Sequence, residues 1–570
     1  RTEEEASLAL AAIYKRYYAR LKLETRDKGY RFYLHPLVKI TPGPELSNQM
    51  GSGMPDILLI MMSVLAAIIM VMACFNYTNL MIAKSLSRAR EIGVRKIVGA
   101  QRWQVFAQFV GEAMIFSLCA LAISYLFLQV LKPAFLQMRL TREFPVSLEE
   151  DVGLYLYFLL FAVVIGIIAG LLPAGYLSAF RAVKVLKDPG NIKVYSRLTF
   201  RKILMVTQFA LSLTFIIVVF VIYRQMNFMV TTDYGIDDKN TINVRLQGLA
   251  FDRLANEMRK LPGVIRVGGV SHSLGTWADG ASDYRKNKDD APFTMRDFMV
   301  DENYLANLDV KFLAGGNFEA TKEGEFEKHV ILNETALKGF GFKDPVSAVG
   351  QTLYVNDTVM LAVIGVMKDF HFRPLSYQIG PLAMRYNTGE LGYVSARIVP
   401  SQKDQVVAAL EAIWKKLDPV HPLEWQMMED QIDQAYDDAG FSDILTMVGY
   451  IGFLAITIAC LGMLGMAMYA TQTRVKEIGV RKVMGASVPD ITLLLSKSFL
   501  MLIGIAVVVS VPISFWLGTA FLELYAYKIQ ISVGLILSGV ILVLLLGLIT
   551  ICSQTIKAAL TNPVKSLRYE

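Results

Sequence analysis

The chain has little of what catalytic and metal-binding proteins commonly use. It holds 4 cysteines and 5 histidines in 570 residues. The cysteines are scattered through apolar runs, which favours neither a disulfide framework nor a zinc site. Asp369 and His371 lack a third ligand at a useful spacing, so we interpret them as part of a polar-capped turn. No Ser-His-Asp or Cys-His arrangement stands out. We therefore expect no enzyme active site, metal or cofactor in this chain.

Two further absences concern nucleotides. No G-x-x-x-x-G-K-[ST] loop occurs, so if ATP is used, another polypeptide binds it. No part of the long polar region is basic enough to indicate nucleic-acid binding.

Charge is also scarce, and this points to the membrane. Only 19% of the residues are charged and 54% are hydrophobic, whereas soluble domains carry about a quarter charged residues. A bilayer-spanning helix needs about 20 apolar residues. Seven runs are long enough: 55–82, 104–131, 153–178, 203–223, 444–470, 491–521 and 532–556. The sequence therefore predicts an α-helical membrane protein with seven spans.

The short loops predict how the spans are oriented. Lys and Arg gather in loops 84–102, 181–202 and 474–482 and in the tail, whereas loop 132–151 mixes both signs. Because cytoplasmic loops carry an excess of Lys and Arg, the first set is predicted to be cytoplasmic. Segments 1–54, 132–151 and 224–443 are then on the other side.

The chain repeats itself. "REIGVRKIVGA" at 90–100 and "KEIGVRKVMGA" at 476–486 are identical at eight of eleven positions and lie 386 residues apart. "AAIYKR" at 11–16 resembles "EAIWKK" at 411–416, and "AVKVLK" at 182–187 resembles "PVKSLR" at 563–568. Repeats of this kind indicate two halves about a pseudo-two-fold axis. The first half lacks a span and most of an external domain, so we expect a complete form with eight spans and two external domains.

The repeated motif predicts a short basic amphipathic helix at the cytoplasmic surface. Glu91 precedes Arg95 by four residues, as Glu477 precedes Arg481, and this spacing suits an ion pair on one helix face. A glycine follows each helix and is placed to end it. Apolar contacts are expected from Ile92, Val94, Ile97 and Val98, and from Ile478, Val480, Val483 and Met484. A topology anchor would accept almost any basic string, so the shared sequence favours a partner surface that is contacted twice.

These motifs carry a resemblance to a known family. The chain resembles the FtsX-like permeases, the membrane subunits of MacB-type ABC transporters, in its duplicated-repeat form and truncated at the N-terminus. The resemblance extends to "RKILMVTQFALSL" at 201–213, "VILNETALKGFGF" at 330–342, "VIGVMKDFHFRPL" at 363–375 and "NPVKSLR" at 562–568. It implies that each motif is a coupling helix on a cytoplasmic ABC ATPase dimer, which binds ATP and Mg. The implied docking residues are Glu91, Gly93, Arg95, Lys96 and Gly99, and Glu477, Gly479, Arg481, Lys482 and Gly485.

The expected organisation has five parts. They are a remnant of a first periplasmic domain and stalk (1–54), a first repeat of three spans (55–190), a fourth span (191–223), an α+β periplasmic core domain (224–443) and a second repeat (444–570). Within the core domain, strands are predicted at 241–246, 264–271, 359–367 and 392–399, and helices at 251–261 and 403–417. Residues 224–235 and 429–443 are expected to continue the adjoining spans as stalk helices.

Two functions remain open at this point. The first is the permease subunit of an ABC complex in the bacterial inner membrane. It would couple ATP hydrolysis by its partner to periplasmic movement, for export of a drug, peptide or lipoprotein, with a periplasmic adaptor and an outer-membrane channel as further partners. The alternative is a non-transporting transmitter that regulates a cell-wall hydrolase or senses an antimicrobial peptide. Membrane lipid surrounds the spans in either case, and the complex holds one chain as a pseudo-dimer or two as a homodimer.

Overall fold

The computed structural model describes residues 3–18, 32, 34–36, 43, 56–85, 89–138, 151–178, 195–320, 327–356, 359–438, 440–473 and 475–560. Two compact units are distinguished. One, the soluble unit, comprises 1–34, 225–442 and 523–529; the other, the helical unit, comprises 35–224, 443–522 and 530–570. The basic segments 182–187 and 563–568 lie outside the described residues.

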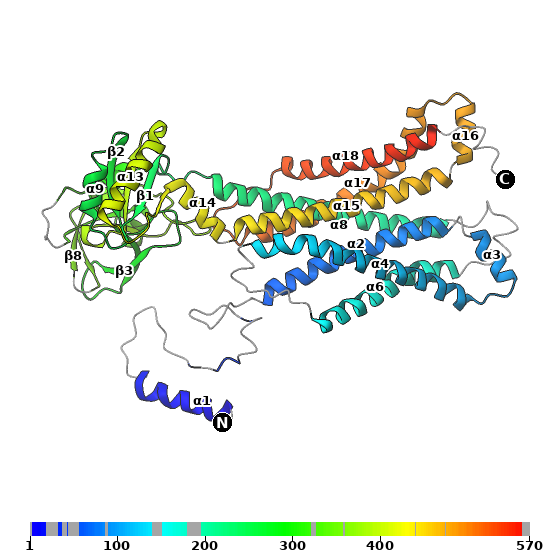
Figure 1. Ribbon diagram of the computed structural model, residues 1–570, viewed down its shortest axis with the longest axis horizontal. Coiled ribbons are helices and arrows are strands. Elements are labelled where there is room, and N and C mark those ends of the chain that lie inside the picture. The colour runs from blue at the N-terminus through cyan, green and yellow to red at the C-terminus, as the bar shows by residue number, and fades with distance from the viewer. Residues whose placement is uncertain are drawn as a thin grey trace. The chain divides into compact units, whose positions relative to one another are not determined.

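The helical unit contains the predicted spans. Among the described residues, seven helices are long and apolar enough to cross a membrane, which confirms the seven runs. They are α2 (Asp56–Ser85), α4 (Arg102–Gln137), α6 (Val152–Ser178), α8 (Tyr195–Thr231), α15 (Phe441–Thr473), α17 (Val488–Leu522) and α18 (Val533–Leu560) (Figure 1). Two short helices, α3 (Ala89–Ile97) and α16 (Val475–Val483), each follow a span.

Small residues let these helices approach closely. A Cβ added to Gly465 of α15 would lie 2.8 Å from a methyl carbon of Leu80, and one added to Gly462 would collide with the side-chain amide of Gln208. Next to this contact, the buried Asn79 donates a hydrogen bond of 3.4 Å to Gln208. These glycines therefore allow close packing of the neighbouring helices.

The soluble unit is built on one sheet of eleven strands among the described residues. Its order is β11–β1–β10–β2–β4–β3–β7–β8–β6–β9, with β5 beside β8, and a further pairing of β4 with β9 closes six strands into a ring. The strands are β1 (Thr241–Arg245), β2 (Val264–Val270), β3 (Gly280–Arg285), β4 (Phe293–Val300), β5 (Phe312–Gly315), β6 (His329–Asn333), β7 (Thr352–Val355), β8 (Val359–Met367), β9 (Leu382–Tyr386), β10 (Tyr393–Ile398) and β11 (Trp425–Met427).

Helices cover the open part of this sheet. α9 (Phe251–Met258) and α13 (Lys403–Leu417) pack on β1, β2 and β10 through one apolar core. On α13 the buried residues are Val406, Leu410 and Trp414, which recur every fourth residue and so form one helix face. Further helices of this unit are α10 (Tyr304–Asn307), α11 (Glu334–Gly339), α12 (Pro345–Ala348) and α14 (Met428–Asp438). The predicted strands and both predicted helices are present, so the α+β assignment is confirmed.

The stalk prediction needs a correction. α8 does continue to Thr231, but residues 429–443 do not form one extension of the next span. α14 ends at Asp438, α15 begins at Phe441, and Gly440 between them has φ of 78°. A left-handed residue interrupts the helix, because the right-handed helical backbone requires negative φ.

Candidate docking motifs

The two motif helices have the same pattern of exposure. Over 91–100 and 477–486, all ten positions of one copy match the burial class of the other. In both, the second and third residues are buried (Ile92 and Gly93, Ile478 and Gly479), whereas the Glu and Arg are exposed. The sequence repeat is therefore also a repeat of local environment.

Both predicted ion pairs form. Arg95 Nη2 lies 2.6 Å from Glu91 Oε1, and Arg481 Nη2 lies 3.0 Å from Glu477 Oε1. In the first copy, Arg95 also donates to Gln108 of α4 at 2.8 Å. Exposed pairs of this kind contribute little stability, about 0–1 kcal/mol each. Their effect is to hold the charged side chains in a defined place on the helix surface.

One isoleucine anchors each motif. Ile92 packs in a core with Met81, Val105, Phe109 and Ala174, which joins α3 to α2, α4 and α6. Ile478 packs against Ile491 of α17 in the same way.

The other apolar residues of each motif do not behave as expected. Val94, Ile97 and Val98 in the first copy are exposed, and so are Val480, Val483 and Met484 in the second. The prediction that all four apolar residues make contacts is right only for Ile92 and Ile478 within the described part of the chain. The remaining three form an exposed apolar patch beside the ion pair.

The ends of the motif helices are closed as predicted. Gly99 has φ of 105° and Gly485 has φ of 93°, conformations that other residues rarely adopt. Reciprocal side-chain bonds then start the next span: Gln101 with Gln104 at α4, and Ser487 with Asp490 at α17. Each motif is thus a short helix locked between two turns at the end of a span.

The lysine of the first motif has an internal partner. Lys96 Nζ donates to the Ser178 carbonyl oxygen at 2.6 Å. Partial burial, with Arg102 nearby, lowers the pKa of Lys96. Because this contact ties α3 to the end of α6, Lys96 positions the motif. Its counterpart Lys482 is half-buried.

The Asp369–His371 turn is structural. The Asp369 carboxylate accepts from Thr335 N at 3.1 Å and from Thr335 Oγ1 at 2.8 Å, as a polar cap does. The His371 ring meets the Tyr527 ring edge-on, with centroids 4.7 Å apart. This arrangement agrees with the interpretation of a capped turn.

Tyr527 belongs to a contact that sequence analysis missed. It lies in 523–529, the connection between α17 and α18 that forms part of the soluble unit. Tyr527 Oη accepts from Ile379 N at 3.1 Å. The buried Gln225 donates to the Tyr527 carbonyl oxygen at 2.9 Å and accepts from Ile529 N at 3.0 Å. The side chains of Tyr527 and Gln225 therefore hydrogen-bond the α17–α18 connection to the rest of the soluble unit.

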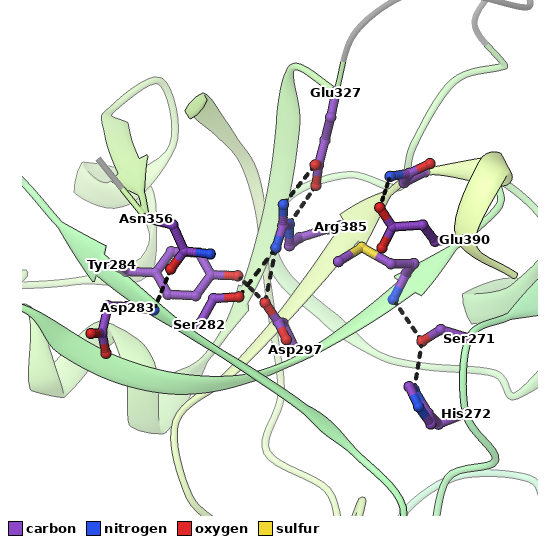
Figure 2. Close-up of polar contacts among 12 residues, drawn as sticks. Ser271, His272, Ser282, Asp283, Tyr284, Asp297, Glu327, Asn356, Arg385 and Glu390 are labelled. Carbon is purple, nitrogen blue, oxygen red and sulfur yellow. Dashed lines mark hydrogen bonds and ion pairs between the residues drawn. The ribbon is translucent and has the colours of Figure 1, made fainter. Parts of the chain in front are cut away.

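A buried ion network closes the strand ring (Figure 2). Figure 2 shows the Arg385 guanidinium of β9 between two carboxylates: Arg385 Nη1 lies 3.0 Å from Asp297 Oδ2, and its Nε and Nη2 lie 2.5 and 2.7 Å from the oxygens of Glu327. Tyr284 Oη donates to the same Asp297 oxygen at 3.0 Å. Burial, together with that carboxylate, raises the pKa of Tyr284. We regard this network as structural, since its members bind one another.

Comparisons with known proteins agree with this architecture of apolar helices and an α+β domain. Residues 63–182 and 449–563 match the family model of the FtsX-like permease C-terminal region, once in each repeat. Residues 203–413 match that of the MacB-like periplasmic core domain. The chain thus combines seven candidate membrane spans with both of these regions, and it belongs to the FtsX-like permeases with a MacB-like periplasmic core domain.

Individual relatives are distant. The chain is 24% identical over 238 residues to the uncharacterized ABC transporter permease YknZ of Bacillus subtilis (strain 168), covering 40% of this chain and 58% of that protein, less than two thirds of its length. The periplasmic region of MacB from Actinobacillus actinomycetemcomitans is 18% identical, with a TM-score of 0.26, covering 36% of this chain and 97% of that one. The extracellular domain of YknZ from Gram-positive bacteria is 13% identical, with a TM-score of 0.24, covering 33% and 98%.

Proposed function

We propose that this permease works with a separate cytoplasmic ABC ATPase dimer and couples ATP hydrolysis to movement of its core domain. α3 and α16 are the docking helices, one for each ATPase subunit. The observation that carries this proposal is the pair of motif helices with the same exposure at ten positions, each presenting a fixed ion pair beside an exposed apolar patch. A surface that recurs in this detail suits a partner that is itself present twice.

The chemistry of each motif suits a protein partner. The cores of protein interfaces are apolar and their rims are polar. Each motif offers Glu and Arg at an apolar patch, and each is anchored by its isoleucine to the following span. A force on the motif is therefore passed to a membrane helix.

The connection 523–529 gives the second repeat a way to act on the core domain. It joins α17 to α18 and is hydrogen-bonded to the soluble unit through Tyr527 and Gln225. Movement of α17 or α18 is then transmitted to the core domain through this connection. No substrate pathway through the membrane is required. This suits mechanotransmission in the bacterial inner membrane, with ATP and Mg bound by the partner and the core domain in the periplasm.

We propose export from the periplasm or the membrane as the biological role. The substrate class is a drug, peptide or lipoprotein, and a periplasmic adaptor with an outer-membrane channel would complete the path.

The test is co-purification from native membranes in mild detergent, with mass spectrometry of the bound proteins. The double variant Arg95→Glu with Arg481→Glu places like charges beside Glu91 and Glu477, and we expect it to lose an ATPase that the wild type retains. Arg245→Glu is the matched control, because Arg245 also makes an exposed ion pair, 3.1 Å from Glu424, but in the soluble unit. An ATPase retained by the double variant, or absent from folded wild type, would contradict the docking role.

A further inference from the structure

The sheet of the soluble unit has a polar face at its open end. Successive residues of a strand point to opposite faces. In β1, Ile242 and Val244 are buried in the core that α9 and α13 share with the sheet. Asn243 therefore lies on the other face, together with Gln426, its register partner on β11. The apolar residues of β1 face one layer of helices, and its polar residues are left to line something else.

A cleft of about 690 Å³ lies over this polar face, and all the residues that line it belong to the soluble unit. One wall is α14, and the other is the turn 273–278 that follows β2. The Trp277 indole nitrogen of that turn donates to the Ala435 carbonyl oxygen of α14 at 2.8 Å, which joins the two walls. The volume falls within the range of about 300–1,000 Å³ that is usual for ligand sites.

The floor of the cleft holds a polar group that is not satisfied. Asn243 Nδ2 donates to Gln431 Oε1 at 2.7 Å and to Ser273 Oγ at 3.2 Å. Ser273 Oγ donates to the same Gln431 oxygen at 2.7 Å. Asn243 Oδ1 is buried and has no hydrogen-bond partner among the described residues. Such an unpaired acceptor costs free energy in the empty cleft, and a donor supplied by a ligand removes that cost.

The edge of the sheet also borders the cleft. β11 stands at one end of the strand order and pairs with β1 alone among the described strands. The cleft is lined by both Trp425 and Gln426, which are consecutive and so point to opposite faces of the sheet. The cleft therefore runs along the edge of β11 as well as over one face.

The backbone of Trp425 is directed toward this edge. Arg245 N of β1 donates to the Glu424 carbonyl oxygen at 3.0 Å. In an antiparallel pair, successive residues alternate between bonding the partner strand and facing away from it. The N–H and C=O of Trp425, the next residue along, therefore point away from β1. A donor and an acceptor side by side on a strand edge are what an extended peptide pairs with.

The side chains around the cleft favour a basic ligand. α14 carries five acidic residues and no Lys or Arg: Glu429, Asp430, Asp433, Asp437 and Asp438. Arg245, the one basic side chain that lines the cleft, is already paired with Glu424, 3.1 Å away. Trp277 and Trp425 line the cleft as well. Tryptophan is the ring on which Lys and Arg side chains stack best.

We propose that this cleft binds a short extended peptide with basic side chains, which pairs with β11 at Trp425 as an added strand. β11 has three residues, so the main-chain pairing is short, and the acidic wall and the two indole rings supply the remaining recognition. Because the two walls are joined through Trp277, the cleft suits a single free chain and not the surface of a folded adaptor. The assignment rests on the export role proposed above, for which it selects a peptide as the substrate class.

The test is peptide binding to the full chain in phosphatidylcholine nanodiscs, measured by microscale thermophoresis with empty nanodiscs as the blank. The probe is the pentapeptide acetyl-Lys-Val-Lys-Val-Lys-amide. Two further forms carry N-methyl groups on every second residue, so that one edge or the other of the extended peptide is blocked. A fourth peptide has glutamate in place of lysine.

Two variants test the site itself. Trp425→Pro removes the outward N–H, and proline is tolerated on an edge strand where that N–H faces away from the sheet. Trp425→Ala is the matched control, because it also lacks the indole ring but keeps the N–H. The methylated peptides are read on the wild type, so the test of strand pairing does not depend on how a variant folds.

We expect the lysine peptide to bind and the glutamate peptide to bind at least about 10-fold more weakly, since α14 repels it. One methylated form is expected to keep the parent affinity and the other to lose about 10-fold, as is typical when one partner of a hydrogen bond is left unpaired. Trp425→Pro is expected to bind the parent peptide about 10-fold more weakly than Trp425→Ala.

Three outcomes would overturn the proposal: no saturable binding of the lysine peptide, equal affinities of the two methylated forms, or equal affinities of the two Trp425 variants. The assay contains no ATPase. Failure of peptide binding is therefore distinguishable from failure of the docking role, which the co-purification above measures.

Discussion

The exposed apolar patch of each motif allows us to predict how much free energy of binding is lost when the patch is removed. Val98 is 82% exposed and Met484 is 81% exposed. Full burial of a Val or Met side chain is worth about 1.5–3 kcal/mol, and most of that burial is still to be gained on docking. We expect Val98→Ser with Met484→Ser to cost about 3 kcal/mol of binding free energy in total, which is a roughly 100-fold weaker complex.

The assay measures the affinity of the purified permease, in lipid nanodiscs, for the ATPase that co-purifies with it, by biolayer interferometry. Met501→Ser is the control, since it replaces a comparably exposed methionine of α17 outside the motif. If the double variant is folded and binds the ATPase with the same affinity as the wild type, the view that these patches are buried against a partner is refuted. A loss shared by the control would show that the effect is not specific to the motifs.

Three further predictions concern the soluble unit. Arg385→Met leaves the Asp297 and Glu327 carboxylates buried without their cation. We expect the free energy of unfolding, measured by denaturant titration, to fall by about 3–5 kcal/mol. An unchanged free energy of unfolding would mean that the strand ring does not depend on this network. Tyr527→Leu removes the acceptor of the Ile379 amide, so hydrogen exchange of that amide quickens, and unchanged exchange would contradict the contact. Burial lowers the pKa of His371 from its usual 6.5, so the unfolded chain binds more protons and stability falls as the pH drops from 6.5 through the folded pKa; His371→Phe should flatten thermal stability measured from pH 7.5 to 5.5, and an unaltered slope would exclude His371 as its source.

Local features of the site were accessible from the sequence. Glu91 and Arg95 are four residues apart, and a helix brings such residues together whatever surrounds it. The apolar face of α13 is likewise predicted by the four-residue spacing of its apolar side chains. The break at Gly440 was not seen, because the polar residues on either side continue a helical pattern and only the backbone conformation shows the interruption.

Contacts between distant residues were not accessible. The pairing of β4 with β9 that closes the ring depends on how the intervening strands pack. Arg385 and Asp297 are 88 residues apart, and Gln225 binds the Tyr527 carbonyl across 302 residues. A single sequence carries no periodicity that reports such pairs.

The sequence by itself determined the seven spans, the repeat, the motif helices and the family, because hydrophobic length, periodicity and local spacing act within one turn or one span. Tertiary structure alone decided which faces of the equivalent helices are covered. Phe116 and Leu502 are 386 residues apart and follow the two copies of the motif at the same spacing, yet Phe116 is 58% exposed and Leu502 is buried, because Leu502 lies in the core to which α8 contributes. Burial depends on what lies opposite a side chain, and that is a property of the assembled fold.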